Sequence, residues 1–258
     1  MKITALMENT ASRSDIFSEH GLSLYIEAAE HKILFDMGQT ELFYKNALTL
    51  GIDISLVDIA ILSHGHYDHG GGLKKFLEVN KNAKVYISPL AFYPYYNGKG
   101  KYIGLDVSLN DESRLIYVEN EETIDTSLSV FTKNHMERPN FIGYFGLTKK
   151  IGDEYVPDEF KHEQYLLIEE KGKRILISGC SHKGIIDIVN WFKPDILIGG
   201  FHISKISDTR ELDKIATALS LHSTKYYTCH CTGVEQYNYL KSKMESLEYL
   251  CSGKTIEI

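Results

Sequence analysis

Residues 57–73 read VDIAILSHGHYDHGGGL, and this stretch decides the fold because it joins an apolar run to a dense polar cluster. The run VDIAILS has the continuous apolar character of a buried strand, and it ends at Ser63. Four potential metal ligands follow within six residues: His64, His66, Asp68 and His69. Imidazole nitrogen and carboxylate oxygen together suit zinc, iron or manganese, whereas magnesium or calcium would prefer oxygen alone. The alternative is a surface loop that is rich in histidine by chance.

The spacing inside this cluster predicts two metal positions. His64 and His66 lie two residues apart, so on extended backbone they share one face and can hold one ion. Gly65 permits the tight path between them. Asp68 and His69 follow where the chain turns toward GGLKKFLEVN, a segment with helical spacing, and they point to a second ion nearby.

One loop cannot complete two coordination shells, so other ligands must come from distant strand ends. The candidates each follow an apolar strand: Cys180 and His182 after ILISG, His202 after ILIGGF, and His230 after YYTC. Neighbouring strands end at a common edge of a sheet, so we expect these side chains to converge on one cleft. Other interpretations stay open: a small buried residue for Cys180, a solvent-facing side chain for His182 and a core residue for His202.

The pattern of the whole chain predicts an α/β (α+β) protein with sheets covered by outer helices. Strands predominate early, as in KITALME and KILFD, and strands alternate with helices after ILISG. No repeat or linker divides the chain, so we predict a single domain over residues 1–258. An irregular insertion rich in tyrosine and glycine interrupts it around 89–114.

Composition narrows the function classes. An apolar content of 43% and a charged content of 24% are ordinary for a globular protein. The formal charge of -7 argues against nucleic acid as a partner, because phosphate contacts need clustered lysine and arginine. No apolar run has the length of a signal peptide core or a membrane span, which predicts a cytoplasmic protein without a membrane partner. Cys229 and Cys231 are too close for an ordinary disulfide framework, so we expect reduced thiols.

The segment HGHYDH matches the HxHxDH signature, and by it the chain resembles the metallo-β-lactamase superfamily. This resemblance implies a four-layer αββα sandwich, with one or two metal ions at the edge of the two sheets. Within the superfamily, the chain resembles the dihydropteroate-synthase-like enzymes of methanopterin biosynthesis. The segments that carry this finer resemblance are ENT, ILFDMGQT, ISGCSHKGI, IGGFHIS and CHCTG.

The resemblance also implies which side chains bind metal. It places His64 and His66 at the first ion, and Asp68, His69 and His230 at the second. The metal ligands expected in all are His64, His66, Asp68, His69, Cys180, His182 and His230.

Two positions depart from the superfamily pattern. Cys180 stands where a bridging aspartate is usual, and a thiolate there would favour zinc. The usual histidine on a middle strand has one counterpart in sequence order, His135, but its neighbours do not match, and a surface loop histidine is the favoured interpretation. The expected cofactor is zinc, one or two ions, with iron or manganese as alternatives.

We therefore predict a hydrolase that uses a metal-activated water on a small ester or phosphoester. His182 and His202 are the expected catalytic side chains, donating a proton to the leaving group. One alternative is a transferase that joins a pterin methylene diphosphate to an aromatic acceptor. The other is a non-catalytic protein that binds metal or ligand. The partner is a small molecule, aromatic or phosphorylated, and the residues do not indicate an oligomeric state.

Two further expectations concern the surroundings of the site. The segment Pro89 to Glu112 is expected to cover the metal cleft as a lid, with its aromatic side chains stacking on a flat ring. Those side chains are Phe92, Tyr93, Tyr95 and Tyr96. Asn9, His20 and Asp36 are expected as hydrogen-bond partners of the ligating imidazoles, which need an acceptor for their other nitrogen.

Overall fold

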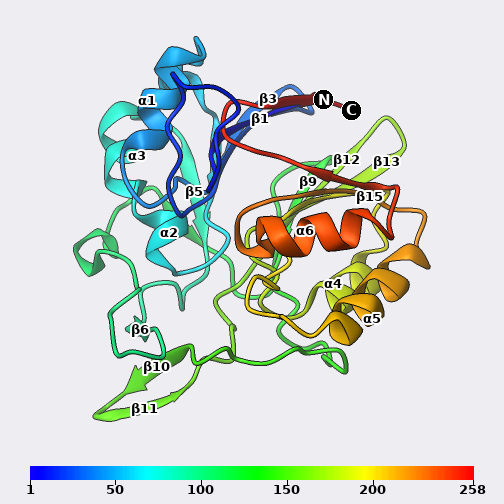
Figure 1. Cartoon of the computed structure of the whole chain (residues 1–258). Helices are drawn as coiled ribbons and strands as arrows, with labels where there is room; N and C mark the ends of the chain where they lie inside the picture. The colour runs from blue at the N-terminus through cyan, green and yellow to red at the C-terminus, as the bar shows by residue number, and fades with distance from the viewer.

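Two seven-stranded β-sheets lie face to face in the computed structural model, which describes residues 1–258 (Figure 1). Helices α1 and α3 pack on the outer face of the first sheet, and helices α4, α5 and α6 on that of the second. The layers follow the order helix, sheet, sheet, helix. This is the αββα sandwich that the sequence resemblance implied.

The first sheet has the strand order β17-β1-β2-β3-β4-β5-β7. Strands β17, β1, β2 and β3 pair antiparallel, and β3, β4, β5 and β7 pair parallel. Its strands are β1 Lys2–Met7, β2 Ser23–Ala28, β3 His31–Phe35, β4 Ile59–Ile61, β5 Lys84–Ile87, β7 Leu115–Tyr117 and β17 Thr255–Glu257.

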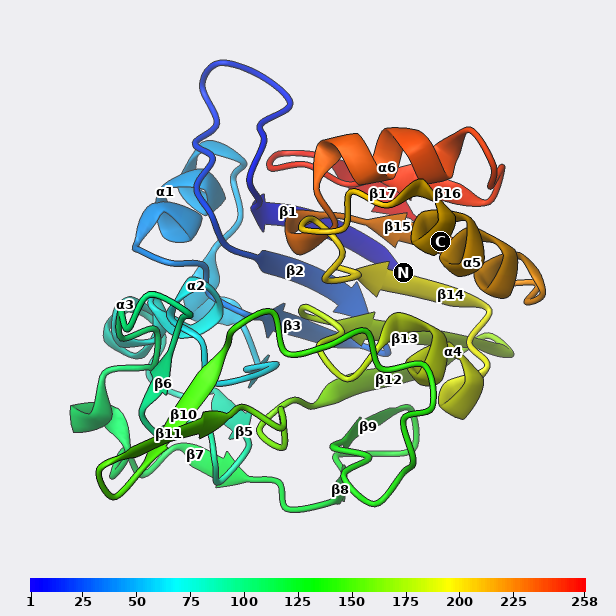
Figure 2. The same cartoon turned by 60° about the horizontal axis from the view of Figure 1, so that its bottom comes forward.

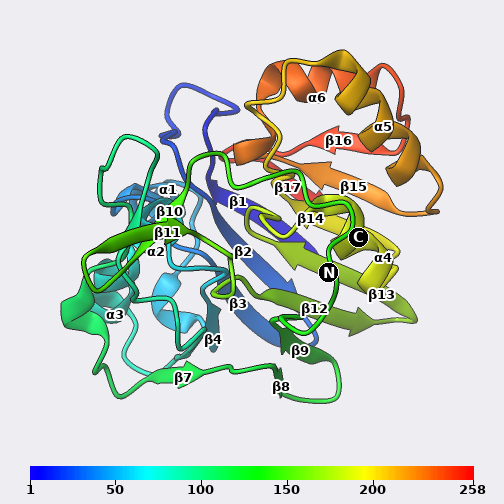
Figure 3. The same cartoon turned by 90° about the horizontal axis from the view of Figure 1, so that it is seen from below.

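The second sheet repeats this plan with the order β16-β15-β14-β13-β12-β9-β8. Strands β8, β9, β12 and β13 pair antiparallel, and β13, β14, β15 and β16 pair parallel. Its strands are β8 Glu121–Thr123, β9 Leu128–Phe131, β12 Tyr165–Glu170, β13 Lys173–Ser178, β14 Ile196–Gly199, β15 Lys225–Thr228 and β16 Leu247–Tyr249. Figure 3 shows the strands of both sheets from below.

A small third sheet, β11-β10-β6, lies outside the sandwich (Figure 2). It consists of β6 Tyr95–Tyr96, β10 Thr148–Ile151 and β11 Glu154–Pro157. Strand β6 belongs to the segment 89–114, which is otherwise irregular apart from a 3-10 turn at Val107–Leu109. Pairing of β6 with β10 therefore ties this segment to a hairpin much later in the chain.

The helices end where the sequence offers a reason. Helix α1 stops before Gly51, which has a positive φ of 71°, and α5 begins after Asp208, whose carboxylate accepts from the amide of Arg210. The helices are α1 Leu42–Thr49, α2 Tyr67–Gly70, α3 Leu73–Val79, α4 Ile185–Phe192, α5 Thr209–Ser220 and α6 Val234–Lys241. None has both the length and the apolar character that crossing a lipid bilayer requires.

Three apolar clusters hold the layers together. One fills the space between the sheets with branched side chains that are 0% exposed, such as Ile26, Ile61, Ile168 and Ile198. The other two join each sheet to its own helices. The buried β4 prediction from VDIAILS is confirmed, because β4 is covered on both faces. The sheets are thus fixed as rigid supports for the loops at their ends.

Candidate metal centre

The loops that carry the predicted ligands all leave the carboxyl ends of parallel strands. His64 follows β4, His182 follows β13, His202 follows β14 and His230 follows β15. Their strands belong to two different sheets, and the loops meet over one edge of the sandwich. A cleft of about 190 Å³ opens there, and it is lined by Asp68, Cys180 and several of the histidines.

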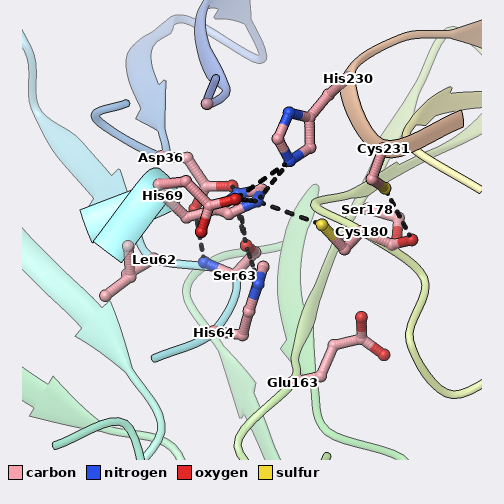
Figure 4. Close-up of polar contacts among 12 residues, drawn as sticks. Asp36, Leu62, Ser63, His64, His69, Glu163, Ser178, Cys180, His230 and Cys231 are labelled. Atoms are coloured by element: carbon pink, nitrogen blue, oxygen red, sulfur yellow. Dashed lines mark hydrogen bonds and ion pairs between the residues drawn. The ribbon is translucent and has the colours of Figure 1, made fainter. Parts of the chain in front are cut away.

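Asp36 organises the centre from beneath. It follows β3 with a positive φ of 59°, and its carboxylate accepts hydrogen bonds from the amide and the hydroxyl of Ser63, each at 2.7 Å. Its Oδ2 also lies 2.6 Å from Nδ1 of His69 (Figure 4). Because the Ser63 hydroxyl donates its hydrogen bond to Asp36, its oxygen accepts one from His64 Nδ1 at 2.8 Å. One carboxylate therefore fixes the ring orientation of His64 and His69 together.

The first group of potential ligands consists of His64, His66 and His182. Nε2 of His182 lies 3.3 Å from Nε2 of His64, and the rings of His66 and His182 are 5.0 Å apart between centroids. All three side chains are buried. Phe160 stacks on His182 at 4.5 Å and holds its ring from the far side.

The second group consists of Asp68, His69, Cys180 and His230. His69 Nε2 lies 3.2 Å from Cys180 Sγ and 3.2 Å from His230 Nε2, contacts that Figure 4 draws as dashed lines. Asp68 Oδ2 lies 3.4 Å from His230 Nε2 and 3.9 Å from His69 Nε2. Nitrogen, oxygen and sulfur donors thus converge on one small volume beside the first group.

The N-terminal segment supports His230. Asn9 Oδ1 lies 2.8 Å from His230 Nδ1, and the buried carboxylate of Glu8 accepts from the backbone amide of His230 at 2.6 Å. Tyr249 donates to the same carboxylate at 2.7 Å. The expectation that Asn9 partners a candidate ligand is confirmed, and Glu8 adds a support that we did not expect.

Electrostatics keep most of these imidazoles neutral. Burial lowers the pKa of His64 and of His182 well below the usual value, and lowers the pKa of His230 to about 4. For Asp68, burial opposes ionisation, but the charge of His69 and hydrogen bonds from His20 and His230 hold its pKa well below normal. The result is a set of neutral nitrogens around an ionised carboxylate, the protonation state in which such groups bind metal.

The arrangement fits a divalent cation. Nδ1 of His69 donates to Asp36 and Nδ1 of His230 donates to Asn9, which directs the two Nε2 atoms at each other, 3.2 Å apart. When both rings are neutral, these two atoms carry lone pairs. Facing lone pairs repel unless a cation or a shared proton lies between them. For His69, burial lowers the pKa, but the charges of Asp36 and Asp68 outweigh it and raise the pKa above the usual value. Positive charge is therefore stabilised at this point.

A further pair of residues, His162 and Asp158, positions the loop of the histidine cluster and was missed in the sequence. The amide of Gly65 donates to His162 Nδ1 at 2.8 Å, and His162 Nε2 donates to Asp158 at 2.9 Å. The same carboxylate oxygen lies 3.6 Å from Nε2 of His66. Asp158 directly follows β11, but β11 is mostly exposed, and His162 lies in the loop before β12. Neither residue follows an apolar strand, which is the feature that predicted the other candidate ligands.

Glu163 fixes the loop that follows β13. Its buried carboxylate accepts from the amides of His182 and Lys183, at 2.7 and 3.0 Å, and from the hydroxyl of Tyr165 at 2.6 Å. Lys183 in turn donates to the carbonyl oxygens of Thr132 and Glu163. These bonds hold the side chains of Cys180 and His182 over the centre from the second sheet.

The sequence profile of the metallo-beta-lactamase superfamily matches residues 19–219. This chain belongs to the metallo-β-lactamase superfamily. An uncharacterised protein of Methanocaldococcus jannaschii is 33% identical over 99% of this chain and 100% of its own length. The 7,8-dihydropterin-6-methyl-4-(beta-D-ribofuranosyl)-aminobenzene-5'-phosphate synthase of the same organism is 30% identical over 100% of this chain and 96% of its own length. The resemblance to methanopterin enzymes is thereby confirmed.

A solved structure is similar along the whole chain. Tm1679, a metal-dependent hydrolase of the β-lactamase superfamily, superposes with a TM-score of 0.87 at 28% identity. The match covers 100% of this chain and 99% of Tm1679. The overall fold is therefore shared with another member of the superfamily along the whole chain.

His182, and not His135, lies in the first group of potential ligands. His135 was the counterpart in sequence order, with an exposed loop histidine as the favoured interpretation; it is exposed in a turn after β9 and belongs to none of the groups of potential ligands. His182 lies in its place beside His64 and His66. The loop after β13 reaches both groups, through Cys180 and His182, which were both expected among the metal ligands.

The segment 89–114 lies at the cleft, as the lid expectation requires, but the aromatic side chains expected to stack on a substrate do not line it. Asn97 and Ile103 line the cleft, so the segment 89–114 does reach it. Tyr95 is 1% exposed, stacks on His162 at 4.1 Å and donates to the carbonyl of Leu90, and it serves as a support. Phe92 packs in the apolar cluster under the first sheet. Neither Tyr93 nor Tyr96 lines the cleft.

Proposed function

We propose that this protein is a metal-dependent hydrolase with a binuclear centre that holds zinc. The observation that carries the proposal is the convergence of two ligand groups, the first of three imidazoles and the second of nitrogen, oxygen and sulfur donors. Such donor sets suit zinc, with iron or manganese as alternatives. The first ion would be held by His64, His66 and His182. The second would be held by Asp68, His69, Cys180 and His230.

Divalent cations held there supply Lewis acidity, which lowers the pKa of water and polarises the bond to be broken. The chain's own residues do the rest. Asp36 keeps the lone pairs of His64 and His69 directed at the centre, and Asn9 does the same for His230. His202 lies on the cleft wall, and its Nε2 is the atom we assign to passing a proton to the leaving group.

The cleft favours a small substrate, an ester or phosphoester. Its volume of about 190 Å³ admits a compact molecule and no polymer groove. Lys205 and Ser204 line it beside His202 and offer donors to an anionic group. The chain's charge of -7 disfavours a nucleic acid.

A transferase is the second candidate, since the relative that is 30% identical carries the name of a synthase. In that reaction a bond between the pterin methylene carbon and an aromatic carbon would replace the bond to diphosphate. Diphosphate would leave and the aromatic ring would release a proton, without water. The two functions differ in whether an oxygen atom of water enters the product.

Metal content tests the centre first. Elemental analysis of protein purified without chelator should give between one and two equivalents of zinc, iron or manganese. His66→Ala and Asp68→Ala should each lower this occupancy, whereas His135→Ala, at an exposed turn, is the matched control and should leave it unchanged. Folded and active protein without metal would end the proposal.

Activity distinguishes the two reactions. The metal-loaded protein is assayed on a panel of small carboxylic esters, phosphomonoesters and phosphodiesters in isotopically labelled water. A hydrolase incorporates label into the product in proportion to turnover. Turnover of a pterin methylene diphosphate that needs an aromatic acceptor and incorporates no label would instead establish the transferase. Absence of turnover on both would leave a binding protein.

A further inference from the structure

A third group of potential ligands lies on the wall of the cleft, beside the histidine centre. It consists of Cys180, His202 and Cys231, whose ligand atoms all lie within 4.8 Å of one another. Cys231 Sγ donates to the carbonyl oxygen of Cys180 at 3.4 Å (Figure 4), and the amide of His202 donates to Cys231 Sγ at 3.3 Å. Two thiols and one imidazole, from the loops after β13, β14 and β15, thus share one corner of the cleft.

These two thiols differ from an ordinary buried cysteine. Cys229, two residues before Cys231, is 0% exposed and packs in the apolar cluster between the sheets. Cys180 and Cys231 belong to no apolar cluster and line the cleft. The Cys231 sulfur occupies space that a side chain at position 200 would fill, because a Cβ at Gly200 would collide with Cys231 Sγ. The position therefore accommodates a thiol that faces polar neighbours.

His202 supplies the second, independent observation. Its backbone adopts the left-handed region with φ 53°, which is costly for a residue other than glycine. Neither ring nitrogen has a hydrogen-bond partner. Nδ1 is buried, and Nε2 is not among the buried atoms. Nδ1 is the ring nitrogen closer to the histidine's own backbone, and that backbone contacts Cys231. An unpartnered buried nitrogen next to two thiols is costly unless something binds there.

We propose that Cys180, Cys231 and Nδ1 of His202 form a binding site for a thiophilic divalent cation, adjoining the histidine centre and sharing Cys180 with it. On binding, each thiol releases its proton to solvent, two sulfur–metal bonds and one nitrogen–metal bond form, and no electron is transferred. Two thiolates and one imidazole are ligands that zinc and cadmium prefer over harder cations. The fourth position faces the cleft and remains for a small ligand.

This site extends the proposed function without depending on it. In the proposed hydrolase, Cys180 is a ligand of the histidine centre only, and His202 transfers a proton through Nε2. A cation on Nδ1 leaves Nε2 facing the cleft, and it fixes the ring that we assign to proton transfer. The sulfur of Cys180, which has more than one lone pair, can bridge both positions, so occupancy of one alters affinity at the other.

Cadmium alone is the probe, added to the metal-loaded protein. The ultraviolet charge-transfer band between sulfur and cadmium measures how many thiolates bind. Wild type should reach the intensity of two thiolates per protein, and Cys231→Ser should lose about half of it. His202→Ala should keep the intensity at saturation but weaken cadmium binding roughly tenfold. Cys251→Ser, a half-buried cysteine that does not line the cleft, is the matched control and should equal the wild type.

Equal bands in wild type and Cys231→Ser would overturn the site, because Cys180 alone would then carry the signal. Should Cys231→Ser not fold, X-ray absorption at the cadmium edge in wild type counts the sulfurs directly: two support the site, and one or none refutes it. Zinc content of His66→Ala, measured separately, reports on the histidine centre. Failure of the proposed hydrolase and failure of this site therefore give different results.

Discussion

At the scale of single residues, the centre depends on side chains that direct the ligands. Asp36 is the main example, since its carboxylate accepts two hydrogen bonds from Ser63 and one from His69. His69 must then carry its proton on Nδ1, which leaves Nε2 free to face Cys180 and His230. The tautomer of the ligand is set by a residue outside the cleft.

Asp36→Asn should therefore weaken metal binding without changing any candidate ligand. An amide nitrogen in place of Oδ2 would oppose the donors of Ser63 and His69, and His69 would move its proton to Nε2. We expect a loss of affinity for the second ion of about 10- to 100-fold, measured by competition with a chromophoric chelator. Asp153→Asn, at a fully exposed carboxylate in the β10–β11 turn, is the matched control. Equal affinities in the two variants would contradict this role of Asp36.

At the scale of elements, the loop between β4 and α2 is pressed against the segment 89–114. A Cβ at Gly65 would collide with the carbonyl of Ala91, so this close approach explains the glycine between the two histidines. The sequence indicated a tight path at Gly65, but the neighbouring carbonyl comes from an irregular segment whose position could not be predicted.

Gly65→Ala should lower both stability and metal content. The loop must retreat from Ala91, which breaks the bond from the Gly65 amide to His162 and displaces His64 and His66. We expect a loss of about 1–3 kcal/mol in the free energy of unfolding, as for other overpacked sites, together with reduced zinc content. Gly152→Ala has open space around its Cβ and a positive φ of 59°, so it measures backbone strain alone. Full zinc content in Gly65→Ala would show that the loop tolerates the displacement.

Elements with a clear period were predictable, and connections between distant segments were not. The strand ILISG, the helix GIIDIVNWF and the strand DILIGG appear as β13, α4 and β14 because their apolar spacing reflects burial. Strand β6, which pairs with β10 over fifty residues away, has no such spacing. The same limit applies to the site: candidate ligands that follow apolar strands were predicted, whereas His162, which follows none, was missed.

At the scale of the whole molecule, the site costs stability that metal can restore. Each sheet contributes loops to one cleft, and the sandwich buries carboxylates there together with several histidines. Burial lowers the pKa of five of them: His64, His162, His182, His202 and His230. His69 alone among the buried rings has a raised pKa. The balance of these shifts fixes how the metal-free protein responds to acid.

The metal-free protein should lose stability as the pH falls below about 6.5, the pKa of an unfolded histidine. Below that pH the histidines are protonated in the unfolded chain but stay neutral in the folded protein. The free energy of unfolding therefore decreases until the pH reaches the pKa of each histidine in the folded state. For His230 this window runs from about 6.5 down to about 4, and for His202 down to about 3. His69 acts in the opposite sense, because its stabilisation is present at low pH and is lost as the pH rises through its folded value. The loss of stability from the five histidines with lowered pKa exceeds the gain from His69 at low pH.

Thermal melts of chelator-treated protein between about pH 7.5 and pH 5 measure this effect. His230 alone should contribute a loss of about 2 kcal/mol at about pH 5, since one pKa unit corresponds to about 1.4 kcal/mol. His230→Gln should therefore show a shallower decline of Tm toward acid than wild type, and His135→Gln, at an exposed position, should match the wild type. Zinc added at about pH 7.5 should raise Tm, because it binds the folded state through rings that are already neutral. A metal-free protein whose Tm stays constant down to about pH 5 would mean that these histidines are hydrated, and the dry, preformed centre would have to be abandoned.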